Sequence, residues 1–165
     1  MKNVLCVLLI AAFAAGAAFA ADPVEGFWIS RDEKTGKDTG GWQIYQERGV
    51  LFGRLLSGKD VKADTKADKC IGPYKGFPEK GTPSELTVLG QRWIFGLTRV
   101  ETGSWSGGSV INPEDGKVWN CKIIFHAADG KKFKVDTLEM RGSWGPFGRS
   151  QYWPKATEAQ VLAIK

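Results

Sequence analysis

The segment from residue 103 to residue 126 constrains the fold most strongly, because it has the pattern of two strands joined by a tight turn. Asn112 and Pro113 open the turn, since the proline ring holds φ near the value that a type I turn requires, and Gly116 closes it where a positive φ is expected. After the turn, apolar residues recur at every second position: Trp119, Cys121, Ile123 and Phe125. This period of two predicts a β-hairpin with one buried face, and therefore an antiparallel fold.

The rest of the chain repeats this pattern of short strands separated by turns. Further strands are expected at residues 26–30, 42–47, 50–57, 91–100, 132–141 and 148–153. The sequence predicts helix only as a single turn within 84–89 and a short segment within 157–165. About eight short strands with little helix predict an all-β protein, and we favour a closed antiparallel β-barrel because closure leaves no exposed sheet edge.

The long connection at residues 58–83 differs in composition from the predicted strands around it. It begins with alternating acidic and basic residues that have almost no apolar content, and it continues with several glycines and prolines. We therefore expect a solvated helical turn or a mobile loop without long regular structure.

The first twenty residues have the pattern of a secretory signal peptide. Lys2 precedes an apolar run rich in alanine and leucine, and Ala18-Phe19-Ala20 fits the small-residue pattern of a cleavage site. The run is short for a membrane span. We expect cleavage after Ala20, a single β-barrel domain over residues 21–165, and a periplasmic or secreted mature protein without a membrane span.

Two cysteines, Cys70 and Cys121, remain after the predicted cleavage. An even number in an oxidising compartment favours a disulfide, which would close a loop of about 50 residues and stabilise the fold by about 4 kcal/mol in the chain-entropy model. The alternative is two separate thiols, with Cys121 as a small core residue. A metal site is disfavoured, because the single histidine, His126, lies on the opposite strand face from Cys121.

The formal net charge of the chain is +5, which we interpret as favouring solubility or a loose attraction to anionic envelope surfaces. No nucleic-acid-binding motif is present, and a protein outside the cytoplasm does not normally meet nucleic acid, so we expect no nucleic-acid partner. The sequence also contains no phosphate loop and no metal-ligand spacing, so we expect neither a cofactor nor a metal.

Several short motifs are spread over nearly the whole mature chain. They are Asp22-Pro23, Gly26-Phe27-Trp28, Trp105-Ser106-Gly107-Gly108, Ile111-Asn112-Pro113-Glu114-Asp115-Gly116, Arg141-Gly142 and Gly148-Arg149-Ser150-Gln151-Tyr152-Trp153. Together they resemble an uncharacterised family of small secreted bacterial proteins, the domain-of-unknown-function family 2147. Asn112 stands where that family usually has an acidic residue, and we expect no consequence because asparagine is also a good turn former.

The Gly26-Phe27-Trp28 motif on the first strand also resembles the lipocalin signature, in which a tryptophan closes the barrel base and an arginine from a late strand stacks over it. Arg149 or Arg141 would take that role here. Both resemblances imply a lipocalin-like β-barrel. In such a barrel the residues with structural roles would be Gly26, Trp28, Asn112, Pro113, Gly116, Arg149 and Trp153.

Seven tryptophans are many for a chain of this length. A barrel of about eight strands is just wide enough either to be filled by its own side chains or to hold one small ligand. In the first case the tryptophans are core residues. In the second case we expect a cavity open at one end, with Arg99 or Arg141 orienting an anionic head group and with a lining of Trp42, Phe52, Trp105, Trp119 and Phe125.

These observations predict a secreted or periplasmic protein that binds a small, largely apolar or amphipathic ligand without catalysis. The acidic residues lie mostly in predicted loops and His126 lies at a strand end, so we assign no catalytic residue. Two alternatives stay open. One is a filled barrel that acts as an envelope interaction or structural module, and the other is a hydrolase or isomerase that uses a carboxylate within the barrel.

Overall fold

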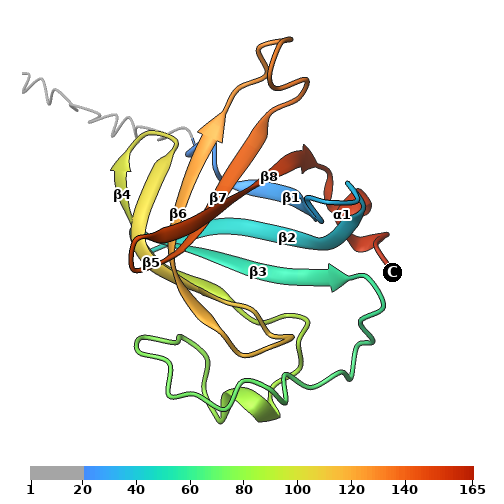
Figure 1. Ribbon diagram of the computed structural model, residues 1–165, viewed down its shortest axis with the longest axis vertical. Coiled ribbons are helices and arrows are strands. Elements are labelled where there is room, and N and C mark those ends of the chain that lie inside the picture. Colours follow the sequence, from blue (N-terminus) through green and yellow to red (C-terminus); the bar gives the residue numbers. More distant parts are fainter. Residues whose placement is uncertain (1–20) are drawn as a thin grey trace, which may run out of the picture.

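Each strand of the protein pairs with the next one along the chain, and the eighth pairs with the first, which closes the sheet into a barrel (Figure 1). The computed structural model describes residues 21–165, and the expected all-β barrel of about eight antiparallel strands is confirmed there. The predicted signal peptide, residues 1–20, lies outside the described residues. The strands are β1 Gly26–Arg31, β2 Asp38–Glu47, β3 Val50–Gly58, β4 Ile94–Glu101, β5 Ser104–Ile111, β6 Val118–His126, β7 Thr137–Trp144 and β8 Phe147–Ala156.

The seventh strand differs from its prediction. The sequence pattern places a strand over 132–141, but β7 begins only at Thr137. In the preceding loop the carboxylate of Asp129 accepts hydrogen bonds from the backbone N–H groups of Lys131 and Phe133. Such local bonds between a side chain and the backbone compete with strand pairing, and this explains the late start of the strand.

The chain ends in a short helix, α1 Glu158–Leu162, which packs on the outside of the barrel. Thr157 and Gln160 form a capping box, in which each side chain accepts a hydrogen bond from the other residue's backbone N–H. Val161 is fully buried against β2, where Gly41 leaves room for it, because a Cβ atom on Gly41 would collide with Val161.

One end of the barrel is filled by its own side chains. Every second residue of a strand points inward, and at this end the inward residues are large and apolar. Trp28 is fully buried, its indole N–H donates to the carbonyl of Val24 at 2.9 Å, and Phe125 packs edge-on against its ring. Other fully buried side chains in this core are Leu51, Leu97, Trp105, Ile123 and Leu138.

The N-terminal segment closes this filled end. The buried carboxylate of Asp22 accepts a hydrogen bond from the backbone N–H of Gly103, in the turn between β4 and β5. The same carboxylate lies 3.3 Å from Nε of Arg99. The first residues of the described chain are therefore tied to a turn about eighty residues away, and we call this the closed end of the barrel.

The cation over Trp28 is Lys155, and the expectation of Arg149 or Arg141 in that role is wrong. Lys155 lies opposite Trp28 in the pairing of β1 with β8, and its Nζ is 5.4 Å from the centre of the ring. Arg149 pairs instead with Glu33, and Arg141 projects from the outer face of β7. The register of the β1–β8 pairing thus places Lys155, and not an arginine, over Trp28.

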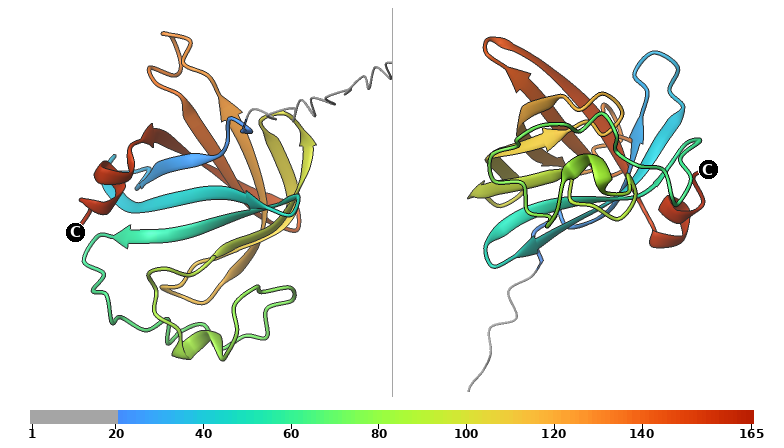
Figure 2. Two further views of the ribbon diagram at one scale, coloured as in Figure 1. Left: turned by 180° about the vertical axis from the view of Figure 1, so that it is seen from behind. Right: turned by 90° about the horizontal axis from the view of Figure 1, so that it is seen from below.

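The connection between β3 and β4, residues 59–93, crosses the barrel end that lies opposite the closed end, and we call it the strap (Figure 2). It contains the 3-10 turn Pro83–Glu85 but little other regular structure. Residues 59–83 are mostly exposed and lack long regular structure, as their composition predicts, but single residues such as Ala67 and Cys70 are buried. Trp93 stacks on Phe77 with ring centres 5.5 Å apart, and its indole N–H donates to the carbonyl of Val88 at 2.6 Å.

The strap is held at the tip of the hairpin formed by β5 and β6. The backbone N–H of Gly116 donates to the carbonyl of Asn112 at 2.8 Å, and Gly116 has the expected positive φ, +70°. A Cβ atom on Gly116 would collide with the carbonyl of Lys69 in the strap. The hydroxyl of Tyr74 donates to the carbonyl of Gly116 at 2.8 Å. A glycine is therefore required here both by the turn and by the close approach of the strap.

We expect Trp28→Ala to lower the free energy of unfolding by about 3–5 kcal/mol, because it removes a fully buried ring from the closed end. Urea denaturation of the mature chain measures this change. The control is Phe147→Ala on β8, where a 70% exposed ring should change stability by less than about 0.5 kcal/mol. Equal effects of the two substitutions would contradict this account of the core.

Candidate functional site

The end of the barrel beneath the strap is hollow. A cavity of about 610 Å³ opens there, within the range of about 300–1,000 Å³ that is typical of small-molecule sites. The barrel is therefore filled at one end and hollow at the other. The apolar side chains that line the cavity are Trp42, Leu55, Val61, Val88, Val110, Ile111, Pro113, Trp119, Met140, Phe147 and Trp153.

Two stacked tryptophans form the deep wall of the cavity. The rings of Trp42 and Trp153 are 5.2 Å apart, with 22° between their planes, and both residues are buried. The indole N–H of Trp42 donates to Oγ of Ser30 at 3.2 Å, and that of Trp153 donates to Oε1 of Gln151 at 3.0 Å. These bonds satisfy the polar atoms of both indoles, so the wall presents apolar ring surface to a ligand.

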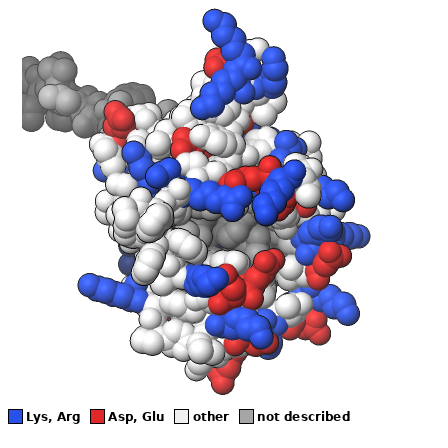
Figure 3. Space-filling view, viewed as in Figure 1, with Lys and Arg blue, Asp and Glu red and all other residues white. Residues whose placement is uncertain are grey.

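The basic side chains at the mouth of the cavity are paired with carboxylates of the protein. Arg31 contacts Asp38 at 2.7 Å, and Arg149 contacts Glu33 at 2.5 Å across the mouth. Figure 3 likewise shows basic and acidic side chains close together over much of one face of the molecule. The mouth therefore offers few charges that are free to bind an ion.

The carboxylate of Asp32 in the β1–β2 loop is held in its ionised form. It accepts hydrogen bonds from the backbone N–H and the hydroxyl of Thr35, and these bonds lower the pKa of Asp32 below its ordinary value. A general acid at neutral pH requires the opposite shift. Asp32 at the mouth therefore acts as a loop-forming residue in this structure.

Part of the expected ligand-binding set lines this cavity. Trp42 and Trp119 do so, from β2 and β6. Trp105 is fully buried in the filled end, and Phe125 packs there against Trp28. The alternation along β6 correctly places Trp119 and Phe125 on one barrel face, but it does not show which end of the barrel each residue occupies.

The other expected residues lie away from the cavity. Phe52 projects from the outer face of β3, with the guanidinium of Arg92 5.2 Å from the centre of its ring. Arg99 lies at the closed end, beside the N-terminal segment. Arg141 lies on the outer face of β7, where Nη1 donates to Oγ of Ser150 at 3.4 Å. Neither arginine reaches a ligand in this cavity.

Sequence reasoning missed most of the lining, including Met140, Phe147 and Gln151. Met140 is on an inward position of β7, and the other two are on inward positions of β8. The predicted last strand begins at Gly148, one residue too late to include Phe147. The alternation that continues through Gln151 to Trp153 was the signal that could have identified them.

The expected disulfide between Cys70 and Cys121 is not formed. Both thiols are free, and both are buried. Cys70 lies in the strap, with Sγ 4.0 Å from the carbonyl oxygen of Pro113. Cys121 points into the barrel from the fourth position of β6. It lies about 10 Å along this strand from Val118, the residue at which β6 begins. Burial raises the pKa of the Cys121 thiol to about 12 and also raises that of Cys70. Within residues 21–165, no group of three or more His, Cys, Asp or Glu side chains is placed to hold a metal ion.

Comparison with solved structures finds the same architecture in protein HP1028 from the human pathogen Helicobacter pylori, which is described as belonging to the lipocalin family. The two chains are 18% identical, with a TM-score of 0.63 over 86% of this chain and 89% of that chain. The fold is therefore a lipocalin-like barrel, as the first-strand motif implies. Among the described residues no helix has the length and apolar character needed to cross a membrane.

The sequence model of a family of uncharacterized proteins conserved in bacteria (DUF2147) matches residues 26–155, from the start of β1 to near the end of β8. The chain belongs to this family, and the resemblance carried by its short motifs is confirmed. A search of curated proteins finds no match.

We expect the native mature protein to show no thiol that reacts with Ellman's reagent, and two reactive thiols after unfolding in guanidinium chloride without reductant. Both side chains are buried, and their raised pKa values keep them in the unreactive thiol form. A disulfide would instead leave no reactive thiol after unfolding and would lower the mass by two hydrogen atoms.

Proposed function

We propose that the protein is a periplasmic or secreted lipocalin-like binding protein for a small, largely apolar or amphipathic molecule, which it holds without transforming it. The observation that carries this proposal is the cavity at the open end of the barrel. Its deep wall is aromatic, and the two arginines at its mouth, Arg31 and Arg149, are paired with carboxylates of the protein. A ligand therefore gains affinity at such a site mainly by burying apolar surface.

The cavity is large enough for burial alone to supply useful affinity. At about 25 cal/mol per Å², roughly 200 Å² of apolar ligand surface removed from water would contribute about 5 kcal/mol. Trp42 and Trp153 are fixed by their indole hydrogen bonds, so little side-chain entropy is lost when a ligand packs against them.

Gln151 favours a ligand that carries one polar group. Its Oε1 accepts from the indole of Trp153, whereas its amide NH₂ group makes no hydrogen bond to any described residue. Gln151 lines the cavity, so its NH₂ group can donate to an oxygen of the ligand. An amphipathic molecule therefore satisfies the site better than a pure hydrocarbon does.

Binding is favoured over catalysis by the positions of the carboxylates. The buried carboxylate of Asp22 lies at the closed end and holds Gly103. At the mouth, Asp32 has a lowered pKa, and Asp115 accepts a hydrogen bond from the backbone N–H of Lys117 in its own turn. A hydrolase or isomerase would need a carboxyl group with a raised pKa inside the cavity. The open cavity likewise favours a ligand-binding barrel over a purely structural module.

Native mass spectrometry of the mature protein, purified from its own cells without denaturation, should show a mass excess that is lost on denaturation. The released mass identifies the ligand. A protein that carries no excess mass and also fails to bind the uncharged probe N-phenyl-1-naphthylamine would contradict the proposal.

Gly142→Leu should weaken binding of N-phenyl-1-naphthylamine at least about tenfold, or about 1.4 kcal/mol. Gly142 lines the cavity, and a Cβ atom there would lie 3.6 Å from Cβ of Trp119, an ordinary contact, so a leucine fits the fold and occupies ligand space. The control is Arg141→Leu, which puts the same side chain on the neighbouring outward position and should leave probe binding unchanged. Fluorescence titration measures both variants, and equal losses would place the probe outside the cavity.

A further inference from the structure

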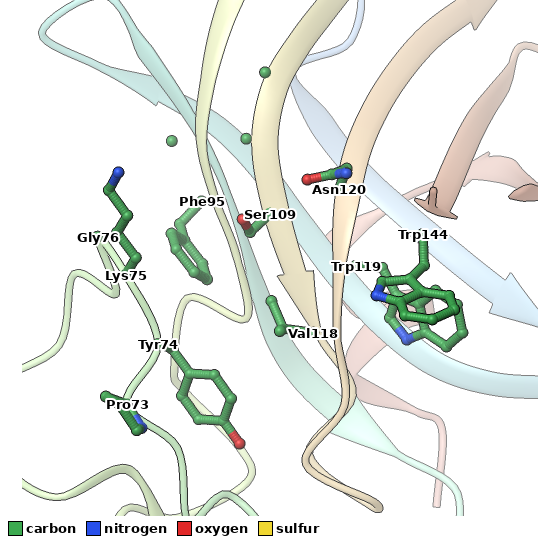
Figure 4. Close-up of a pocket in the computed structure, with 13 residues that line it drawn as sticks. Pro73, Tyr74, Lys75, Gly76, Phe95, Ser109, Val118, Trp119, Asn120 and Trp144 are labelled. Atoms are coloured by element: carbon green, nitrogen blue, oxygen red, sulfur yellow. The ribbon is translucent and has the colours of Figure 1, made fainter. Parts of the chain in front are cut away.

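A second concave surface lies mainly on the outside of the barrel and shares one lining residue, Trp119, with the proposed ligand cavity. It is a groove of about 740 Å³ between the strap and the outer face of β4, β5 and β6, and it extends to the end of β7 (Figure 4). Its floor contains Gly96 and Gly107, both with positive φ, at a point where the pairing of β5 with β6 shifts register. Such a bulge interrupts the strand ladder and leaves backbone exposed between the walls.

The two walls of the groove are aromatic. Trp119 and Trp144 form one wall, and Tyr74 of the strap stands on the opposite side (Figure 4). Trp144 is 68% exposed and Trp119 is 37% exposed, which is high for residues of this size. The ring of Tyr74 is fixed by the bond from its hydroxyl to the carbonyl of Gly116. The walls therefore present flat, accessible rings, with the strap-side ring already fixed in position.

Polar side chains between these walls have spare hydrogen-bonding capacity. Within residues 21–165, the side chains of Lys75, Ser109 and Asn120 make no hydrogen bond or ion pair to any other residue. This is the reverse of the cavity mouth, where Arg31 and Arg149 are paired. Lys75 is the one charged residue among those that line the groove, so no carboxylate of the lining would repel an acidic ligand.

We infer that this groove binds an oligosaccharide chain. A pyranose ring has C–H groups on its faces, which pack against the electron-rich faces of aromatic rings, and hydroxyl groups around its edge, which need donors and acceptors. The groove offers aromatic walls for the faces and Lys75, Ser109 and Asn120 for the hydroxyls. A lipid chain would leave these polar groups unpaired, and a single-stranded nucleic acid would require a row of cations where the groove has one.

The test uses the mature protein and two soluble probes, the β-1,4-linked tetramers of N-acetylglucosamine and of glucose. Two-dimensional ¹H–¹⁵N NMR follows the indole N–H signals during titration. We expect at least one tetramer to shift the signals of Trp119 and Trp144, while those of the buried Trp28 and Trp105 stay unchanged. If neither tetramer binds at millimolar concentration, the inference is overturned.

Two matched variants place the sugar on the groove or elsewhere. Trp144→Ala should weaken tetramer binding at least about tenfold, and its 68% exposure means that the fold should persist. The control is Phe147→Ala, which removes a 70% exposed ring from the cross-strand partner of Trp144. Phe147 lines the cavity and does not line the groove, so tetramer binding should be unchanged.

Equal losses of tetramer affinity in the two variants would assign the sugar to the barrel mouth and overturn the proposed sugar site in the groove. Full binding by Trp144→Ala would overturn it as well. N-phenyl-1-naphthylamine provides an independent readout, because Trp144 does not line the cavity and Trp144→Ala should bind this probe as the wild type does. The two probes therefore distinguish a failure of the proposed sugar site in the groove from a failure of the proposed ligand site in the cavity.

Discussion

The contact between the strap and the tip of the β5–β6 hairpin sets the geometry of both concave surfaces. Lys69 approaches the hairpin so closely that only a glycine fits at position 116, and Tyr74 bonds to the same residue. From this anchor the strap contributes Val61 and Val88 to the cavity, and Tyr74 itself to the groove. A strap free to move away from the hairpin would open the cavity and remove one wall of the groove. The irregular segment is therefore the part of the fold on which binding most directly depends.

The strands were predictable from the sequence, whereas the buried contacts of the strap were not, and the pattern of burial explains the difference. In a strand, alternate residues face one core, so burial is visible as a period of two. The buried residues of the strap, such as Ala67 and Cys70, are single positions in a charged or glycine-rich background, and no period marks them. The same absence of a pattern hid the burial of Cys70 in the strap, and the even number of cysteines suggested a bridge that the fold does not form.

The candidate site could be predicted only in part, because alternation identifies the inner face of a barrel without showing the height along its axis. Trp42 and Trp105 both point inward, yet one reaches the cavity and the other is fully buried in the filled end. Height depends on strand tilt and on bulges, such as the register shift between Trp105 and Gly108 in the β5–β6 pairing. These are properties of paired strands, so a single strand's sequence does not contain them. The exposure of Trp144 likewise depends on how β7 pairs with β8, and the sequence of β7 alone does not show it.

The two surfaces differ in how their polar groups are used, and this difference separates their ligands. At the cavity, bonds such as Arg149 to Glu33 are formed within the protein, so a ligand gains mainly from apolar burial. At the groove, Asn120 and its neighbours keep their bonding capacity for a polar ligand. Trp119 lines both surfaces. Energetic coupling between two binding sites is reciprocal. If a ligand in the cavity changes the affinity for the sugar through this indole, the sugar must therefore change the affinity for that ligand by the same factor.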